Sequence, residues 1–180
     1  IQPDIPIPVS PERQPAPDAS SNSFFTAIEQ TRQLVLQHPE IDLLALPENP
    51  ETFIFNQDTA RRHALGELIK ETGKPILLNV DAIDAADSGA GGARRYNIAA
   101  LIDTNRNLVA SYPKIKRVPF VEYIPGETKF PWLRQWFPKS LHVLEGTGAK
   151  VFEVRPGIRV IPLICYEGTF SSFTRQFINL

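Results

Sequence analysis

Residues 162–168 read Pro-Leu-Ile-Cys-Tyr-Glu-Gly and carry the single cysteine of the chain, Cys165. Residues 158–164 are mostly apolar and rich in β-branched side chains, which predicts a buried strand, and Tyr-Glu-Gly breaks that pattern. We therefore expect the thiol where a rigid strand reaches the surface, as a nucleophile with backbone N–H groups facing an oxyanion. A lone cysteine is also commonly a small buried core residue, so the rest of the chain must decide between the two interpretations.

The composition indicates one globular domain. A chain of 180 residues that is 42% hydrophobic can bury a sizeable core. A net charge of −1 gives no basic surface for nucleic acid, and one cysteine excludes an internal disulfide framework or a cysteine-based zinc cluster. There is no signal peptide and no apolar run long enough to span a membrane. The sequence contains no methionine and begins with Ile1, so we expect it to be a piece of a longer polypeptide.

Helices and strands are predicted to alternate along the first half. Residues 1–22 hold six prolines, which predicts a Pro-rich surface segment continuing from a short first strand. We expect a helix over 23–38, capped by Ser23 and with Phe24, Ile28, Leu34 and Leu36 on its apolar face, and a second helix over 58–72, ended by Gly73. Apolar strands are predicted over 41–46 and 75–80.

The second half is predicted to be a meander. A Gly-rich tip, residues 81–95, joins strand 75–80 to a strand over 96–102, and it lacks the Gly-Lys-Ser/Thr ending of a phosphate-binding loop. A turn over 103–107 leads to a strand over 108–112, and a further hairpin is expected over 141–154. The pattern indicates an α/β (α+β) fold with a mixed sheet and helices packed on it.

Two further stretches place charged side chains where predicted strands end. Glu48 follows strand 41–46, where an open α/β sheet collects its chemistry, although it could equally open the next helix. Lys114, Lys116 and Arg117 give three cations in four residues, which suits a solvated face or a pocket shared with Glu122. Alternation cannot choose between Lys114 and Lys116, because both would share one face of an extended segment.

These stretches together resemble the nitrilase, or carbon–nitrogen hydrolase, superfamily. Leu-Pro-Glu at 46–48, Tyr-Pro-Lys at 112–114 and Ile-Cys-Tyr-Glu at 164–167 match its Glu-Lys-Cys signature in order and spacing. Tyr-Asn at 96–97 and Val-Pro-Phe-Val-Glu-Tyr-Ile-Pro at 118–125 resemble the apolipoprotein N-acyltransferase branch, except that Val121 stands in place of a glycine. Plasmid conjugal-transfer proteins with a related domain are similar to the sequence to the same degree.

The resemblance implies roles for individual residues. Cys165 would be the nucleophile and Glu48 the general base, while Lys114 would lower the pKa of the thiol and stabilise the oxyanion. The family match thus selects Lys114 over Lys116. The supporting pocket residues would be Glu122, Glu167 and Tyr166. The resemblance implies no cofactor and no metal.

The resemblance also implies a fold and a function. The fold would be a nitrilase-like αββα sandwich, of which residues 23–180 form the N-terminal two-thirds, incomplete because the chain ends after the nucleophile region. Whether this piece is active by itself stays open. The function would be acyl transfer from a phospholipid to an amine, such as a lipoprotein N-terminus, through a thioester on Cys165.

The resemblance also implies where the domain lies in the cell. The domain would be membrane-associated and extracytoplasmic, in the periplasm, in a bacterial inner-membrane protein anchored through parts absent from this chain. Residues 130–138 hold both tryptophans; buried core is the ordinary interpretation, and an aromatic arm lying on lipid is the one that the resemblance favours. The alternative functions are a soluble nitrilase-type amidase and a catalytically silent nitrilase-like domain of a conjugal-transfer protein.

Overall fold

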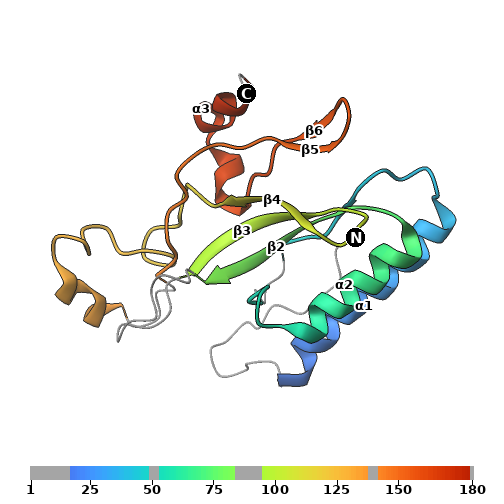
Figure 1. Ribbon diagram of the computed structural model, residues 1–180. Coiled ribbons are helices and arrows are strands. Elements are labelled where there is room, and N and C mark those ends of the chain that lie inside the picture. Colours follow the sequence, from blue (N-terminus) through green and yellow to red (C-terminus); the bar gives the residue numbers. More distant parts are fainter. Residues whose placement is uncertain (1–16, 49–52, 84–94, 138–141, 179–180) are drawn as a thin grey trace.

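The computed structural model describes residues 17–48, 53–83, 95–137 and 142–178. Figure 1 shows a twisted sheet with two long helices on one side and a smaller C-terminal group of elements on the other. The helices are α1 (Pro17–Gln37), α2 (Thr59–Thr72) and α3 (Ser171–Thr174). The strands are β1 (Leu44–Ala45), β2 (Ile76–Ile83), β3 (Arg95–Ile102), β4 (Leu108–Pro113), β5 (Phe152–Arg155) and β6 (Ile158–Val160). The 3₁₀ helices are η1 (Pro131–Trp136), η2 (Cys165–Thr169) and η3 (Arg175–Phe177).

The main sheet has four strands in the order β1-β2-β3-β4. Strand β1 runs parallel to β2, and β3 and β4 follow as antiparallel neighbours, so the predicted mixed sheet and meander are confirmed. In this arrangement β1, β2 and β4 all end at the same edge of the sheet. Glu48 follows β1 and Lys114 follows β4, so the topology brings the two predicted site residues to one edge.

Strict alternation along the strands gives the sheet a core on each face. In β2 and β3, Ile76, Leu78, Val80 and Ile98 pack with side chains of α1 and α2. Leu77, Ala99 and Leu101 face the other way and pack with Phe152, Ile164 and the aromatic rings of α3 and η3. Successive strand residues point to opposite faces, so one sequence serves both cores.

The two long helices follow local signals with one difference. Helix α2 ends at Gly73, with a φ of 65°, as predicted. Asp58, the first residue of the predicted helix, is its N-cap and accepts from the Arg61 backbone N–H at 2.8 Å. Helix α1 begins at Pro17 rather than Ser23, which suits proline because a first-turn residue needs no N–H donor. Residues 1–16 of the predicted Pro-rich segment and residues 84–94 of the Gly-rich tip lie outside the described residues.

The buried face of α1 also differs from the predicted one. Phe24, Ile28 and Val35 are buried, whereas Leu34 and Leu36 are exposed. Spacings of three and four along a helix place residues 24, 28, 31 and 35 on one side, and Thr31 completes that row by donating to the Ala27 carbonyl at 2.7 Å.

The hairpin predicted over residues 141–154 is wrong. The hairpin lies further along, between β5 and β6, where Gly157 turns the chain with a φ of 82°. The segment before it instead follows the ends of the main sheet: the Leu144 N–H donates to the Arg95 carbonyl and the Gly146 N–H to the Lys114 carbonyl, each at 2.8 Å. Strand β6 ends at Val160, so the predicted strand up to Cys165 is also shorter. No helix in the described part of the chain is long and apolar enough to cross a membrane.

Gly146 is expected to tolerate no side chain, because of where this segment packs. A Cβ there would lie 2.1 Å from the Pro113 carbonyl oxygen, so the Gly146→Ala variant must move backbone next to Lys114. We expect a loss of about 1–3 kcal/mol in the free energy of unfolding, the usual cost of overpacking, measured by urea denaturation. Gly148 has no atom within 4 Å of such a Cβ, so Gly148→Ala is the control and should leave stability unchanged. Equal losses in the two variants would contradict this account.

Candidate active site

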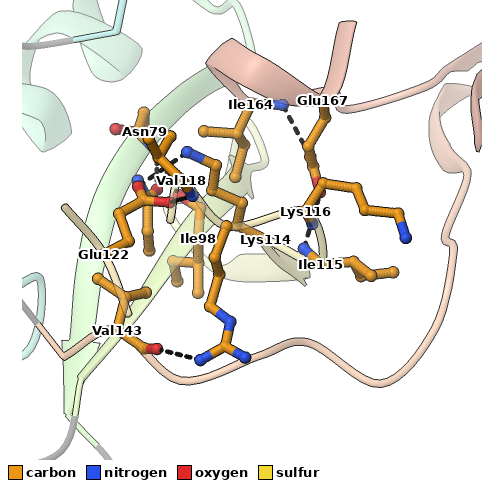
Figure 2. Close-up of polar contacts among 12 residues, drawn as sticks. Asn79, Ile98, Lys114, Ile115, Lys116, Val118, Glu122, Val143, Ile164 and Glu167 are labelled. Carbon is orange, nitrogen blue, oxygen red and sulfur yellow. Dashed lines mark hydrogen bonds and ion pairs between the residues drawn. The ribbon is translucent and has the colours of Figure 1, made fainter. Parts of the chain in front are cut away.

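Lys114 is a buried cation at the end of β4. Its side chain is 1% exposed, and its Nζ lies 2.8 Å from Glu122 Oε1. The other Glu122 oxygen accepts from the Val118 N–H at 2.8 Å, and the Lys114 backbone N–H donates to the Asn97 carbonyl at 2.9 Å. Figure 2 shows the side chains of the lysine and the glutamate pointing at each other. A buried charge is tolerated only when paired in this way, so Glu122 provides the partner that Lys114 needs and fixes the position of its Nζ.

Glu167 is a fully buried carboxylate that joins two loops. Its Oε1 accepts from the Tyr112 hydroxyl at 2.8 Å and from the Ile115 and Lys116 N–H groups at 2.7 and 2.9 Å. Its Oε2 accepts from the Ile164 N–H at 3.0 Å (Figure 2). Burial and the hydrogen bond to Glu167 raise the pKa of Tyr112, so this phenol remains a donor. Glu167 therefore ties the turn that carries Cys165 to the segment that carries Lys114.

Cys165 occupies a strained backbone position at the start of η2. Its φ is 49°, in the left-handed region that residues other than glycine rarely adopt, and its side chain is exposed. Such strain costs of the order of 1–3 kcal/mol and is found where the surrounding structure demands it, often at active sites. Here the four hydrogen bonds that Glu167 accepts hold the Cys165 turn in this conformation.

The surroundings of the sulfur raise the pKa of Cys165 above its ordinary value. Burial contributes most, followed by the negative charge of Glu48 and its hydrogen bond to the thiol, while Lys114 and the Tyr166 backbone N–H act in the opposite direction. Lys114 thus lowers the thiol pKa as expected, but the net shift is upward, because burial and Glu48 together outweigh it.

The structure brings most of the predicted site residues together. Glu48 is exposed and Lys114 is buried, and both affect the pKa of the Cys165 thiol. Glu122 is linked to the site by its ion pair with Lys114, and Glu167 by the hydrogen bond it accepts from the Ile164 N–H. Tyr166 contributes its N–H, while its ring is partly exposed and lies edge-on to Phe170 at 4.7 Å between centroids. Lys116 is separate, since its Nζ lies over the Phe173 ring at 5.5 Å.

The sequence is similar to those of several apolipoprotein N-acyltransferases. The chain is similar to the apolipoprotein N-acyltransferase of Sinorhizobium medicae, with 31% identity over 137 residues that cover 72% of this chain and 25% of the relative. It is 28% identical over 158 residues to apolipoprotein N-acyltransferase 1 of Treponema pallidum, covering 78% of this chain and 29% of the relative. The chain thus spans about a quarter of the length of these relatives. No family model matches it.

Solved structures show the same fold. Nit3 of Saccharomyces cerevisiae, a member of branch 10 of the nitrilase superfamily, matches with a TM-score of 0.61 and 15% identity over 91% of this chain and 56% of its own. The chain has the fold of the nitrilase superfamily. A nitrilase-superfamily amidase of Nesterenkonia matches with a TM-score of 0.57 and 18% identity, over 87% of this chain and 54% of that one. At these identities the matches establish a mixed α/β nitrilase fold, and the relationship to apolipoprotein N-acyltransferases is distant.

One polar pair near the candidate site, Asn79 and Asn97, could not be recognised in the sequence. The Asn79 amide in β2 donates to the side-chain Oδ1 of Asn97 and to the Ile98 carbonyl, while the backbone carbonyl of Asn97 accepts from the Lys114 N–H. Asn79 Oδ1 is buried and has no hydrogen-bond partner among the described residues. The sequence marks Asn97 as part of the Tyr-Asn stretch of the resemblance but not as a partner of Asn79, because nothing in a single sequence shows which strand neighbours it will have.

The raised pKa predicts slow alkylation of Cys165 at neutral pH. Only the thiolate is nucleophilic, so iodoacetamide should label Cys165 more slowly than a model thiol at pH 7, and the rate should rise as pH increases through the raised pKa. Glu48→Gln removes the negative charge and a hydrogen bond, lowers the pKa of Cys165 and should accelerate labelling. Lys114→Ala should slow it. Labelling faster than the model thiol in the wild type would contradict the electrostatic account.

Proposed function

We propose that this chain carries the catalytic residues of an acyltransferase that moves an acyl chain from a phospholipid to an amine through a thioester on Cys165. The observation that carries the proposal is the meeting of Glu48 and Lys114 at the Cys165 sulfur. The acyl substrates are suggested by relatives named apolipoprotein N-acyltransferase. Since the chain spans about a quarter of those relatives, the activity is that of the full-length gene product.

In this mechanism Glu48 takes the Cys165 proton as the sulfur attacks the ester carbonyl of the phospholipid. The new C–S bond leaves a tetrahedral oxyanion, stabilised by the Lys114 ammonium and the Tyr166 N–H. The intermediate collapses by breaking the ester C–O bond, and the departing lysophospholipid oxygen takes the proton from Glu48. The acceptor amine then attacks the thioester, and Glu48 accepts its proton. The C–S bond breaks as the amide forms, and Glu48 returns the proton to the sulfur, which restores the thiol.

The raised pKa of Cys165 supports this order of events. A thiol that stays protonated beside Glu48 at rest resists oxidation and unproductive reaction until a carbonyl arrives. A general base within hydrogen-bond reach then removes the proton during attack. Glu122 and Glu167 would act as pocket residues, the first by pairing with Lys114 and the second by holding the strained Cys165 turn.

The proposed lipid contact is the aromatic arm, defined as Phe130–Phe137. Phe130, Trp132 and Trp136 are 52%, 54% and 74% exposed and form a continuous row, with 6.2 and 6.3 Å between successive ring centroids. The arm, which contains η1, projects from the body of the molecule (Figure 1). Exposed aromatic rings partition into the interface of a lipid bilayer, so this surface suits an acyl donor held in a membrane.

The remaining parts of the proposal concern the whole protein. The solved nitrilase-superfamily structures are nearly twice as long as the region matched, which supports an αββα sandwich completed by further sequence. Residues 23–180 would then be its N-terminal part. The acceptor would be an amine such as a lipoprotein N-terminus, and the domain would lie on the periplasmic side of a bacterial inner membrane.

The test is acyl loading of the full-length gene product in phospholipid-containing detergent. Without an amine acceptor, mass spectrometry should find an acyl adduct on Cys165, because the thioester must outlive the wait for its second substrate. A peptide with a free N-terminal amine should clear it. An amidase, the function favoured by the structural match to the Nesterenkonia enzyme, would turn over small amides without a lipid adduct. Neither activity in a folded protein would favour a catalytically silent domain, such as that of a conjugal-transfer protein.

A further inference from the structure

A polar cluster at the base of the aromatic arm takes no part in the chemistry proposed above. The Glu127 side chain is 12% exposed, and its Oε2 accepts from Arg134 Nε at 3.0 Å and lies 3.2 Å from His142 Nδ1. Its Oε1 accepts from the Ile124 N–H at 3.4 Å. One carboxylate thus joins a residue before the arm, a residue within it and a residue after it.

The charge state of Glu127 suits this role. Burial alone pushes the pKa of Glu127 up, but the hydrogen bonds from Arg134 and Ile124 and the charges of Arg134 and His142 outweigh it. The net effect lowers the pKa below the ordinary carboxyl value, so the carboxylate is ionised at neutral pH. Charge-assisted hydrogen bonds of this kind are stronger than neutral ones.

The arm has little apolar packing to hold it otherwise. No side chain of η1 is buried. Gly126, with a φ of 86°, reverses the chain at the base of the arm, and its carbonyl accepts from the Phe130 N–H at 2.9 Å. The Phe137 ring touches Phe120, at 5.4 Å between centroids, but Phe120 is itself 55% exposed. Because exposed apolar contacts are weak, the polar cluster must provide much of the attachment.

We propose that Glu127 is a positioning residue that fixes the aromatic arm by holding Arg134 and His142 together. The arm's use as an acyl-chain surface rests on the proposed function; the fixation by Glu127 does not. Removing the carboxylate leaves Arg134 and His142 without their shared anion and frees the two tryptophans to move with the arm.

The chain provides its own optical probes for a test. Both tryptophans lie on the arm, and Cys165 is the single cysteine, so a thiol-reactive dye on Cys165 is an energy-transfer acceptor for the arm alone. In the 180-residue chain, Glu127→Ala should lower the tryptophan anisotropy and change the transfer efficiency to the dye. Arg134→Lys keeps the charge without the planar guanidinium and should give an intermediate result.

The matched control is Glu145→Ala. Glu145 also accepts from an arginine, at 2.7 Å, but its partner, Arg117, lies outside the arm. It should leave both optical signals unchanged, and circular dichroism should show that all variants are folded. In the wild type the anisotropy should also fall as acidification protonates Glu127, and Glu127→Gln should lack that transition. Equal anisotropy and transfer in wild type and Glu127→Ala overturn the proposal.

A lipid measurement separates this proposal from the proposed function. Vesicles of phosphatidylcholine with brominated acyl chains should quench the tryptophans of the wild type, and less so those of Glu127→Ala. If Glu127→Ala alters anisotropy and transfer but vesicles quench neither protein, Glu127 still positions the arm, and the lipid role of the arm is what fails.

Discussion

Replacing Glu48 with glutamine is expected to abolish acyl loading of Cys165 while making the thiol easier to alkylate. The amide cannot accept the Cys165 proton, so attack on an ester should slow by about 10²–10⁴-fold, the contribution typical of a general base. The same change removes the charge and the hydrogen bond that raise the pKa of Cys165. Loading is measured by mass spectrometry of the full-length gene product and alkylation by iodoacetamide kinetics at pH 7.

Opposite changes in the two rates distinguish a base from a structural residue. A misfolded site would slow both reactions, and a Glu48 without catalytic function would leave loading intact. Glu145→Gln is the matched control, because Glu145 is another exposed glutamate, and it should change neither rate. Loading by Glu48→Gln at the wild-type rate would remove Glu48 from the mechanism.

Glu167→Ala is expected to be the most destabilising substitution considered for this chain. It deprives four donors of their acceptor: the Tyr112 hydroxyl and the N–H groups of Ile115, Lys116 and Ile164. A buried donor left unpaired costs about 1–3 kcal/mol, and water can reach some of the four, so we expect a total loss of about 3 kcal/mol or more in unfolding free energy. Urea denaturation of the 180-residue chain provides the measurement.

Two further variants show whether this loss comes from the carboxylate network. Tyr112→Phe removes one donor and leaves the carboxylate with three, so it should cost about 1 kcal/mol. Glu145→Ala removes an exposed ion pair and should cost no more than about 1 kcal/mol. A Glu167→Ala variant as stable as Glu145→Ala would show that the Cys165 turn does not depend on Glu167.

Local sequence was sufficient for features that depend on neighbours along the chain. Asp58 and Gly73 mark the ends of α2 because capping involves only residues within one helical turn. Apolar runs bounded by turn residues predicted β2, β3 and β4, since both signals lie within a few residues along the chain. The family-like words around Glu48, Lys114 and Cys165 predicted the nitrilase fold, which the solved structures confirm.

Contacts between distant segments were decided only by the tertiary structure. The hairpin expected over 141–154 does not form, because Leu144 and Gly146 instead donate hydrogen bonds to the Arg95 and Lys114 carbonyls. Gly146 allows this close approach because it has no Cβ to collide with the Pro113 carbonyl. The net direction of the Cys165 pKa depends on burial of the sulfur and on Glu48 reaching it, which together outweigh Lys114. Electrostatic and packing energies depend on distances across the fold, whereas a single sequence specifies only distances along the chain.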